Sequence, residues 1–170
     1  MNGKKLKCFY FMHVRWSWIK QRPHFLALEI SNDLNVDVYY PSSFKPEIRT
    51  STKDDIEINV SKIWKLPFAK NSLIRKINRY IFIFQIYNKS ISEYDIIWLT
   101  HPILLHYVMP YLSSHHRIVY DCMDNVLEFM DAQISPSYKQ WLFSEEKHLI
   151  SIADLVLFSS KKLQEVVEQR

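Results

Sequence analysis

Short apolar runs and amphipathic stretches alternate along nearly the whole of this chain. The apolar runs predict strands at Cys8–Val14, Val36–Tyr40, Ile56–Val60 (continued by Ile63–Leu66), Tyr94–Leu99, Arg117–Asp121 and Asp154–Phe158. Helical spacing lies between them, at His24–Leu34, Asn71–Ile91, Ile103–Leu112, Ser137–Ile152 and Lys161–Gln169. This alternation predicts an α/β fold with a doubly wound, Rossmann-like parallel sheet of about six or seven strands.

Local signals predict where several of these elements end. Pro41 is expected to close the second strand, and the Asn71 side chain is expected to cap the helix that follows it. In the helix Ser137–Ile152, we expect the run from Glu145 to His148 to lie on the polar side.

A single glycine, Gly3, occurs among the 170 residues. The Walker A loop, the Gly-rich dinucleotide fingerprint and the kinase Gly-rich loop each need several glycines, so the sequence excludes all three. A phosphate group bound by this protein must therefore be held by basic side chains and helix N-termini.

The formal net charge is +4, with local groups at Lys4–Lys7 and Arg75–Arg79. No nucleic-acid-binding motif accompanies this charge, so we expect no nucleic-acid partner. An anionic membrane surface or a phosphorylated substrate fits the charge as well. The helix Asn71–Ile91 is basic and amphipathic, with Lys89 near its end, and two interpretations stay open for it: attachment to a membrane surface, or a core-facing helix with a solvated basic side.

Cys8 and Cys122 lie in separate predicted strands and form no CxxC pair, so we expect neither a zinc site nor a disulfide. Two such thiols are typical of the reducing cytosol. The N-terminus shows no small-residue cleavage site and is predicted to be a strand. The run Tyr80–Tyr87 is far too short to cross a membrane.

The segment Trp16–His24 follows the first predicted strand and ends in the run Gln21-Arg22-Pro23-His24. In an open α/β sheet, ligands bind at the carboxyl ends of the strands, where this loop would lie. Indole rings suit sugar rings and arginine suits phosphate, so the candidate substrate-binding residues here are Trp16, Trp18, Gln21, Arg22 and His24. The alternative is structural: the tryptophans cover the core, Pro23 starts a helix and His24 belongs to its cap.

Three further segments are expected at the same edge of the sheet: Thr100-His101-Pro102, Tyr120–Asn125 and Ser159-Ser160. Asp124 and Asp121 are candidate bases that could take a proton from a sugar hydroxyl, although either aspartate could instead cap the next helix. His101 is a third candidate, as a base or as a group that orients the acceptor. Asn125, Ser159 and Ser160 complete the predicted site, with the two serines also placed to cap the last helix.

Four motifs in order carry a family resemblance: the tryptophan loop ending in Gln-Arg-Pro-His, then I-W-L-T-H-P, then V-Y-D-C-M-D-N with Glu128-Phe129 behind it, and finally E-E-x-x-L-I-x-x-A-D-L-V-L-F-S-S-x-x-L. The chain resembles the amino-terminal half of GT-B glycosyltransferases, closest to the bacterial branch that makes surface polysaccharides of the teichuronic acid type. The resemblance covers nearly all of residues 1–170.

The resemblance implies that residues 1–170 are the acceptor-side Rossmann-like domain of a two-domain, metal-independent transferase without a cofactor. A separate carboxyl-terminal domain would hold the nucleotide-sugar donor, so this chain alone is expected to be inactive. The acceptor would be a saccharide or a lipid-linked diphosphate. The resemblance also implies a cytoplasmic enzyme, peripheral on the inner face of the cell membrane. Its base would be Asp124 or His101.

The competing hypothesis is a non-enzymatic α/β domain that binds a ligand or a membrane surface. A receiver domain should carry an acidic pair after its first strand, and a flavodoxin should carry a phosphate loop rich in Ser, Thr or Gly there. The chain instead places basic and aromatic residues after Val14, which argues against both.

Overall fold

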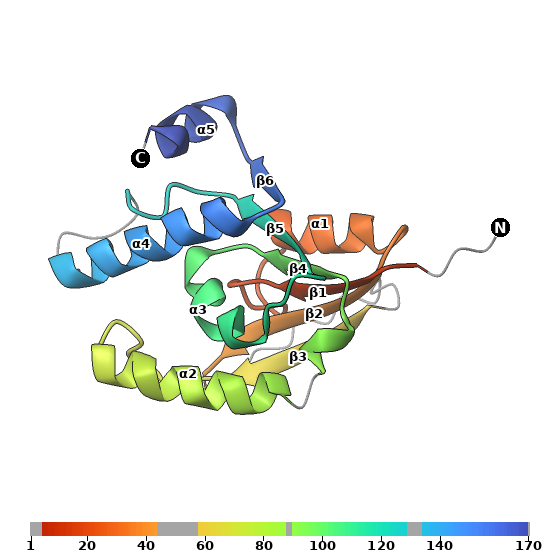
Figure 1. Ribbon diagram of the computed structural model, residues 1–170, viewed down its shortest axis with the longest axis horizontal. Helices are drawn as coiled ribbons and strands as arrows, with labels where there is room; N and C mark the ends of the chain where they lie inside the picture. The colour runs from red at the N-terminus through yellow and green to blue at the C-terminus, as the bar shows by residue number, and fades with distance from the viewer. Residues whose placement is uncertain (1–4, 44–57, 88–89, 129–133, 170) are drawn as a thin grey trace.

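The computed structural model describes residues 5–43, 58–87, 90–128 and 134–169 (Figure 1). Its strands are β1 (Lys7–Phe11), β2 (Asn35–Ser42), β3 (Asn59–Trp64), β4 (Ile96–Leu99), β5 (Arg117–Cys122) and β6 (Leu155–Phe158). Its α-helices are α1 (Arg22–Ile30), α2 (Ser72–Tyr87), α3 (Leu105–Val108), α4 (Pro136–Ile152) and α5 (Lys161–Glu168). Of the predicted features, Lys4, Ile56, Glu57, Lys89 and Phe129 lie outside the described residues.

All the strands run parallel in one six-stranded sheet, in the order β3-β2-β1-β4-β5-β6. This confirms the predicted doubly wound, Rossmann-like fold. The chain leaves β1 toward β2 on one side and later enters β4 on the other, so the switch point lies between the carboxyl ends of β1 and β4. Flavodoxin-like domains have the order 2-1-3-4-5, so this topology is not theirs.

Two apolar cores lie on the two faces of the sheet. On one face, Phe9 and Phe11 of β1 pack with Phe82 of α2 and with residues of α3, α4 and α5. On the other face, Tyr10 of β1 packs with Ala27 of α1. Strand side chains alternate between faces, so consecutive residues of β1 enter different cores. In Figure 1, α2 and α5 lie at opposite ends of the molecule.

Strand β2 continues through Pro41 to Ser42, so the prediction that Pro41 closes it is wrong. The ladder between β1 and β2 ends at Phe11 and Tyr39, and beyond that point β2 pairs only with β3. Because one side of β2 is unpaired there, the N–H that proline lacks removes no ladder hydrogen bond.

The segment 103–112 is not one helix, as the sequence predicted, but a 3₁₀ turn (Pro102–Leu104), the short helix α3 and a second 3₁₀ turn (Met109–Tyr111). Pro110 has no N–H to continue the α-helical hydrogen bonds. Helix α2 ends at Tyr87, short of the predicted Ile91. Its start is as predicted, because the Asn71 side chain accepts hydrogen bonds from the N–H groups of Leu73 and Ile74.

Glu146 does not lie on a polar face of α4, which corrects the prediction. Its side chain is buried, and its Oε1 accepts a hydrogen bond from the Tyr120 hydroxyl at 3.1 Å. Burial and the neighbouring carboxylate both raise the pKa of Tyr120, so the phenol keeps the proton that it donates. A buried glutamate with a dedicated donor on the adjacent strand thus fixes α4 to β5.

Candidate functional site

Two histidines meet at the switch point of the sheet. His13 follows β1, and Thr100 and His101 follow β4. The Thr100 Oγ1 accepts from the His13 backbone N–H at 3.0 Å and lies 2.9 Å from His13 Nδ1. The two imidazole rings are 5.0 Å apart between centroids. The strand order therefore brings three polar side chains together at the place where open α/β sheets bind ligands.

The surroundings of both histidines favour their neutral forms. Burial lowers the pKa of His13 to about 4, and the positive charge of Lys65 acts in the same direction. Burial, His13 and Lys65 hold the pKa of His101 well below its usual value. Lys65, just after β3, has its own pKa lowered by burial and by Arg15. We call Arg15, His13, Lys65, Thr100 and His101 the switch-point cluster. An anion bound there would offset the repulsion between the positive charges of Lys65 and Arg15.

The hydrogen bond of His101 to the backbone fixes its tautomer. Its Nδ1 accepts from the backbone N–H of Ile103 at 3.1 Å, which caps the 3₁₀ turn. In the neutral ring the proton must then be on Nε2. His101 therefore offers a hydrogen-bond donor from Nε2, and it is poorly suited to accept a proton there.

Arg22 and Asp121 form an ion pair between α1 and β5. The Arg22 Nη2 donates to Asp121 Oδ1 at 2.7 Å, and the Asp121 side chain is fully buried. Burial raises the pKa of Asp121, while the Arg22 guanidinium opposes that rise. The second carboxylate oxygen, Oδ2, has no hydrogen-bond partner among the described residues. The sequence predicted that Arg22 contacts a substrate phosphate; in the structure its guanidinium is bound to Asp121.

The loop before α1 separates its two tryptophans. Trp16 packs against the core and against the His24 ring, with 5.2 Å between ring centroids, as in the structural alternative. Trp18 is 56% exposed. His24 is buried, accepts from the Gln21 N–H at 3.0 Å through Nδ1 and lies 3.1 Å from the Arg15 carbonyl through Nε2. His24 thus belongs to the cap of α1, and its burial lowers its pKa.

The remaining predicted residues follow β5 and β6. Asp124 is exposed and close enough to Asp121 for its charge to act on that carboxylate, whereas Asn125 is buried. Ser160 caps α5 by accepting from the Leu163 N–H at 3.2 Å. Ser159 lies beside the end of β5, where its backbone N–H donates a hydrogen bond to the backbone carbonyl of Cys122.

The structure therefore divides the predicted site into two groups. Asp121, Asp124 and Arg22 lie together at the end of β5, and His101 lies at the switch point. The sequence prediction missed His13, Arg15 and Lys65 as site residues. A signal was available for Arg15, because it directly follows the predicted strand Cys8–Val14. His13 and Lys65 lay inside the predicted strands Cys8–Val14 and Ile63–Leu66, and both strands end earlier in the structure, at Phe11 and Trp64.

No three His, Cys, Asp or Glu side chains gather as a possible metal site in the described parts of the chain. Both cysteines are buried, and neither forms a disulfide with another described residue. None of the described helices is long and apolar enough to cross a bilayer. No known protein-family model matches the chain, and no curated protein matches it significantly.

Proposed function

We propose that this chain is the acceptor-binding domain of a GT-B-type glycosyltransferase that works on an anionic, diphosphate-linked acceptor in cell-surface polysaccharide synthesis. The observation that supports this most is the switch-point cluster, where the charge of Lys65 acts on two neutral histidines and that of Arg15 acts on Lys65. The fold is compatible, because a Rossmann-like half is what the resemblance implies. The sugar donor would be a nucleotide sugar held by a second domain.

The proposed reaction joins an acceptor hydroxyl to the anomeric carbon of the donor sugar. The hydroxyl oxygen forms a bond to that carbon while the bond from the carbon to the nucleotide diphosphate oxygen breaks. The hydroxyl proton passes to a base on this domain, and the nucleotide leaves with the bonding electrons. The domain must therefore supply a proton acceptor and hold the acceptor in position.

Asp124 is the better candidate for the base. It is exposed beside the end of β5, where a substrate hydroxyl has access to it. Asp121 is fully buried and bound to Arg22, which suits a structural role better. His101 presents a donor from Nε2 because its Nδ1 is occupied by Ile103, so we assign it to orienting an acceptor oxygen.

Lys65 and Arg15 are assigned to the acceptor diphosphate. Lys65 is half-buried and repelled by Arg15, so a phosphate placed between them would regain favourable charge interactions. A bound anion would also favour the protonated form of His13 and so raise its low pKa. Trp18, exposed in the loop before α1, offers an indole face for a sugar ring.

Calorimetric titration of the chain tests the proposal, with a short-chain prenyl diphosphate bearing one hexose as the probe. We expect binding to the wild type, and a loss of affinity of roughly ten- to a hundredfold in Lys65→Ala from a lost charged contact. Lys162→Ala on α5 removes an exposed lysine elsewhere and should bind like the wild type.

The free hexose separates sugar recognition from diphosphate recognition. It should bind far more weakly than the diphosphate. If the wild type ignores the diphosphate, or if Lys65→Ala and Lys162→Ala bind it equally well, the assignment of the switch-point cluster to an acceptor is wrong.

A further inference from the structure

Exposed apolar side chains are concentrated on one segment of the chain. Eight of the fourteen large apolar residues that are exposed among the described residues belong to Asn59–Tyr87, which covers β3, the turn after it and α2. The most exposed are Phe68 (80%), Tyr80 (73%), Tyr87 (72%) and Phe84 (71%). Apolar patches of this kind mark interaction sites more often than scattered single residues do.

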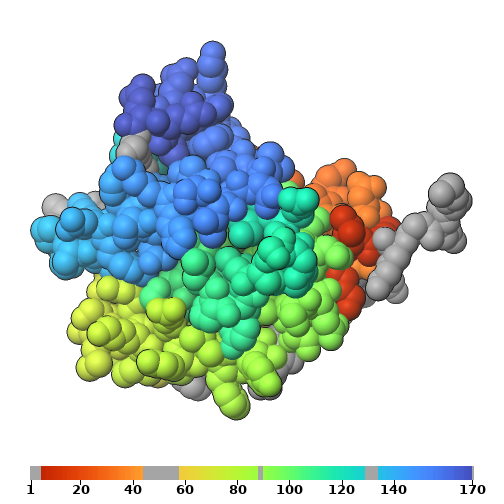
Figure 2. All heavy atoms as spheres, in the orientation of Figure 1, coloured from red at the N-terminus to blue at the C-terminus, as the bar shows by residue number. Residues whose placement is uncertain are grey.

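The residues on α2 form a continuous stripe. Leu73, Ile77, Tyr80, Phe84 and Tyr87 are all exposed and follow each other at intervals of four and three residues, which places them on one side of the helix. Trp64 of β3 extends the stripe, because it lines a shallow groove of about 580 Å³ together with Tyr80, Phe84 and two neighbours on α2. We call these six residues the α2 face; the exposed Phe68 lies in the turn just before α2. Figure 2 shows α2, in yellow to light green, uncovered along the lower rim of the molecule.

The opposite side of α2 is firmly seated, so the stripe is not the exposed side of a loose helix. Phe82 stacks on Tyr107 of α3 with 3.9 Å between ring centroids. The buried Asn78 side chain bonds both backbone groups of Leu66, at 2.7 and 3.1 Å. Gln85 does the same for the backbone of Trp64, at 2.8 and 2.9 Å.

Phe68, four residues before α2, is a second exposed apolar feature of this segment. Its backbone has φ of 64°, in the left-handed region that is costly for a residue with a Cβ, and its ring is the most exposed large apolar side chain described. Holding a phenyl ring in water by a strained turn does not stabilise the isolated fold. A partner that covers the ring would supply the compensating free energy.

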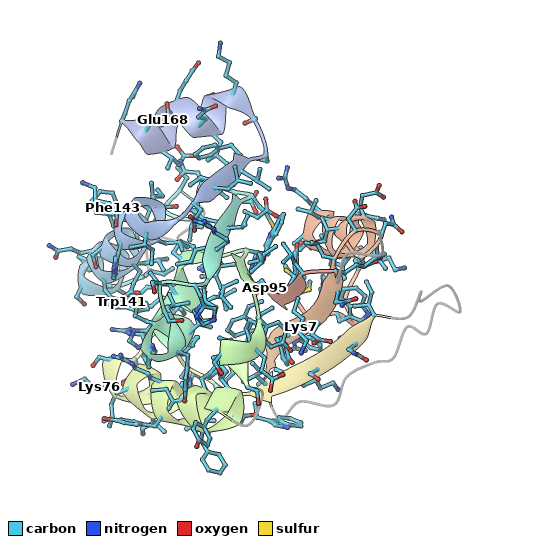
Figure 3. All side chains as sticks on the ribbon, turned by 45° about the vertical axis from the view of Figure 1, so that its right-hand side comes forward. Lys7, Lys76, Asp95, Trp141, Phe143 and Glu168 are labelled. Carbon is cyan, nitrogen blue, oxygen red and sulfur yellow. The ribbon has the colours of Figure 1, made fainter. Side chains whose placement is uncertain are left out.

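The charge around the α2 face points to an anionic partner. From Ile58 to Ser92 the sequence contains no Asp or Glu but seven Lys or Arg residues. Lys62, Lys70 and Lys76 are exposed in this segment. Lys76 lies three residues after Leu73 and four before Tyr80, and so on the same side of α2 as the stripe. Its side chain points away from the body of the molecule in Figure 3.

Arg75 and Arg79, predicted as the membrane-binding group, are placed differently. Arg75 stacks on Trp141 of α4, with its Cζ 4.0 Å from the ring centroid, and on Tyr138 at 5.4 Å. Arg79 is half-buried and acts on His106, whose pKa burial and the two arginines lower to about 4. The outward surface of α2 is therefore made of aromatic and aliphatic side chains with Lys76 beside them.

We propose that the α2 face docks this domain onto an anionic phospholipid bilayer, with the aromatic side chains in the interfacial region and the lysines against the headgroups. Tyr and Trp favour that region, and lysines near it gain from the negative surface potential. A second copy of the chain is a poorer occupant, because the segment Ile58–Ser92 carries basic residues and no acidic ones, so pairing two α2 faces would bring like charges together. The docking is independent of sugar transfer.

Sedimentation with vesicles tests the docking. The wild type should bind vesicles of phosphatidylglycerol and phosphatidylcholine, bind pure phosphatidylcholine much more weakly, and be released by salt. Phe84→Ser should weaken binding about tenfold through lost apolar burial, and Lys76→Glu by about tenfold or more through the reversed charge. Phe25→Ser on α1 and Lys162→Glu on α5 change exposed residues of the same types elsewhere and should bind like the wild type.

Tryptophan quenching by brominated phosphatidylglycerol locates the contact. Trp64→Phe should remove most of the quenching, whereas Trp18→Phe, which removes an exposed indole outside the α2 face, should leave it. The proposal is overturned if the wild type stays in the supernatant at low salt, if it binds neutral vesicles equally well, or if Phe84→Ser binds like Phe25→Ser. Dimerisation that Phe84→Ser abolishes, without vesicle binding, would identify a second copy as the occupant instead.

Discussion

The Arg22 guanidinium reaches the buried Asp121 carboxylate at 2.7 Å and joins the start of α1 to the end of β5. These residues are 99 positions apart in the sequence, and β1, the strand that precedes α1, is separated from β5 in the sheet by β4. The ion pair joins a predicted substrate-binding residue, Arg22, to a predicted candidate base, Asp121.

Removing the arginine should destabilise the fold more than an ordinary surface substitution does. Arg22→Met leaves a buried carboxylate without its charged donor, and we expect a loss of about 2–3 kcal/mol in the free energy of unfolding. Unfolding in urea measures this change in the free energy of unfolding. Arg117→Met is the matched control, because it breaks an exposed ion pair with Asp154 and should cost at most about 1 kcal/mol. Equal losses in the two variants would show that burial adds nothing to the Arg22–Asp121 pair.

The assignment of the base predicts unequal effects at the ends of β4 and β5. In an enzyme that joins this domain to a donor domain, Asp124→Asn should lower kcat by about 10²–10⁴ with little change in acceptor binding. His101→Gln keeps a hydrogen-bond donor and should cost less, mostly in KM. A fully active Asp124→Asn together with an inactive His101→Gln would move the base to His101.

The neutral histidines predict how stability depends on pH. His13 has its pKa lowered to about 4 in the fold, so between pH 6.5 and 4 the unfolded chain takes up a proton that the folded chain does not. The contribution of His13 is therefore fully present above about pH 6.5 and is lost as the pH falls toward 4.

His13→Asn tests this dependence by difference from the wild type. The unfolding midpoint of the wild type should fall more steeply over this range than that of the variant, since carboxylates that titrate there are common to both. Parallel curves for the two proteins would show that His13 is not held neutral by the fold.

The sequence allowed the fold class to be predicted because buried parallel strands leave continuous apolar runs and the helices between them keep helical spacing. What failed depended on tertiary context. Pro41 is tolerated inside β2 because β1 ends earlier, and Glu146 is buried because Tyr120 of β5 supplies its donor. Neither fact is local to the residue concerned.

The candidate site could be predicted only as a set of strand ends. The sequence placed His101, Asp121 and Asp124 at the correct edge, yet it could not show that Arg22 is bound to Asp121 or that Lys65 acts on His101. Those relationships depend on the order of the strands in the sheet, which alternation alone does not specify.

The most direct measurement is NMR of the histidine side chains during titration with the hexosyl prenyl diphosphate, with His13 assigned from His13→Asn. If the acceptor diphosphate binds beside Lys65 and Arg15, the pKa of His13 should rise on saturation from its low value of about 4, and the His101 signals should shift with it. The His148 signals, from the polar side of α4, should not move. An unchanged His13 pKa at saturating diphosphate, or signals that move only on α4, would contradict the proposal that the switch-point cluster binds the acceptor.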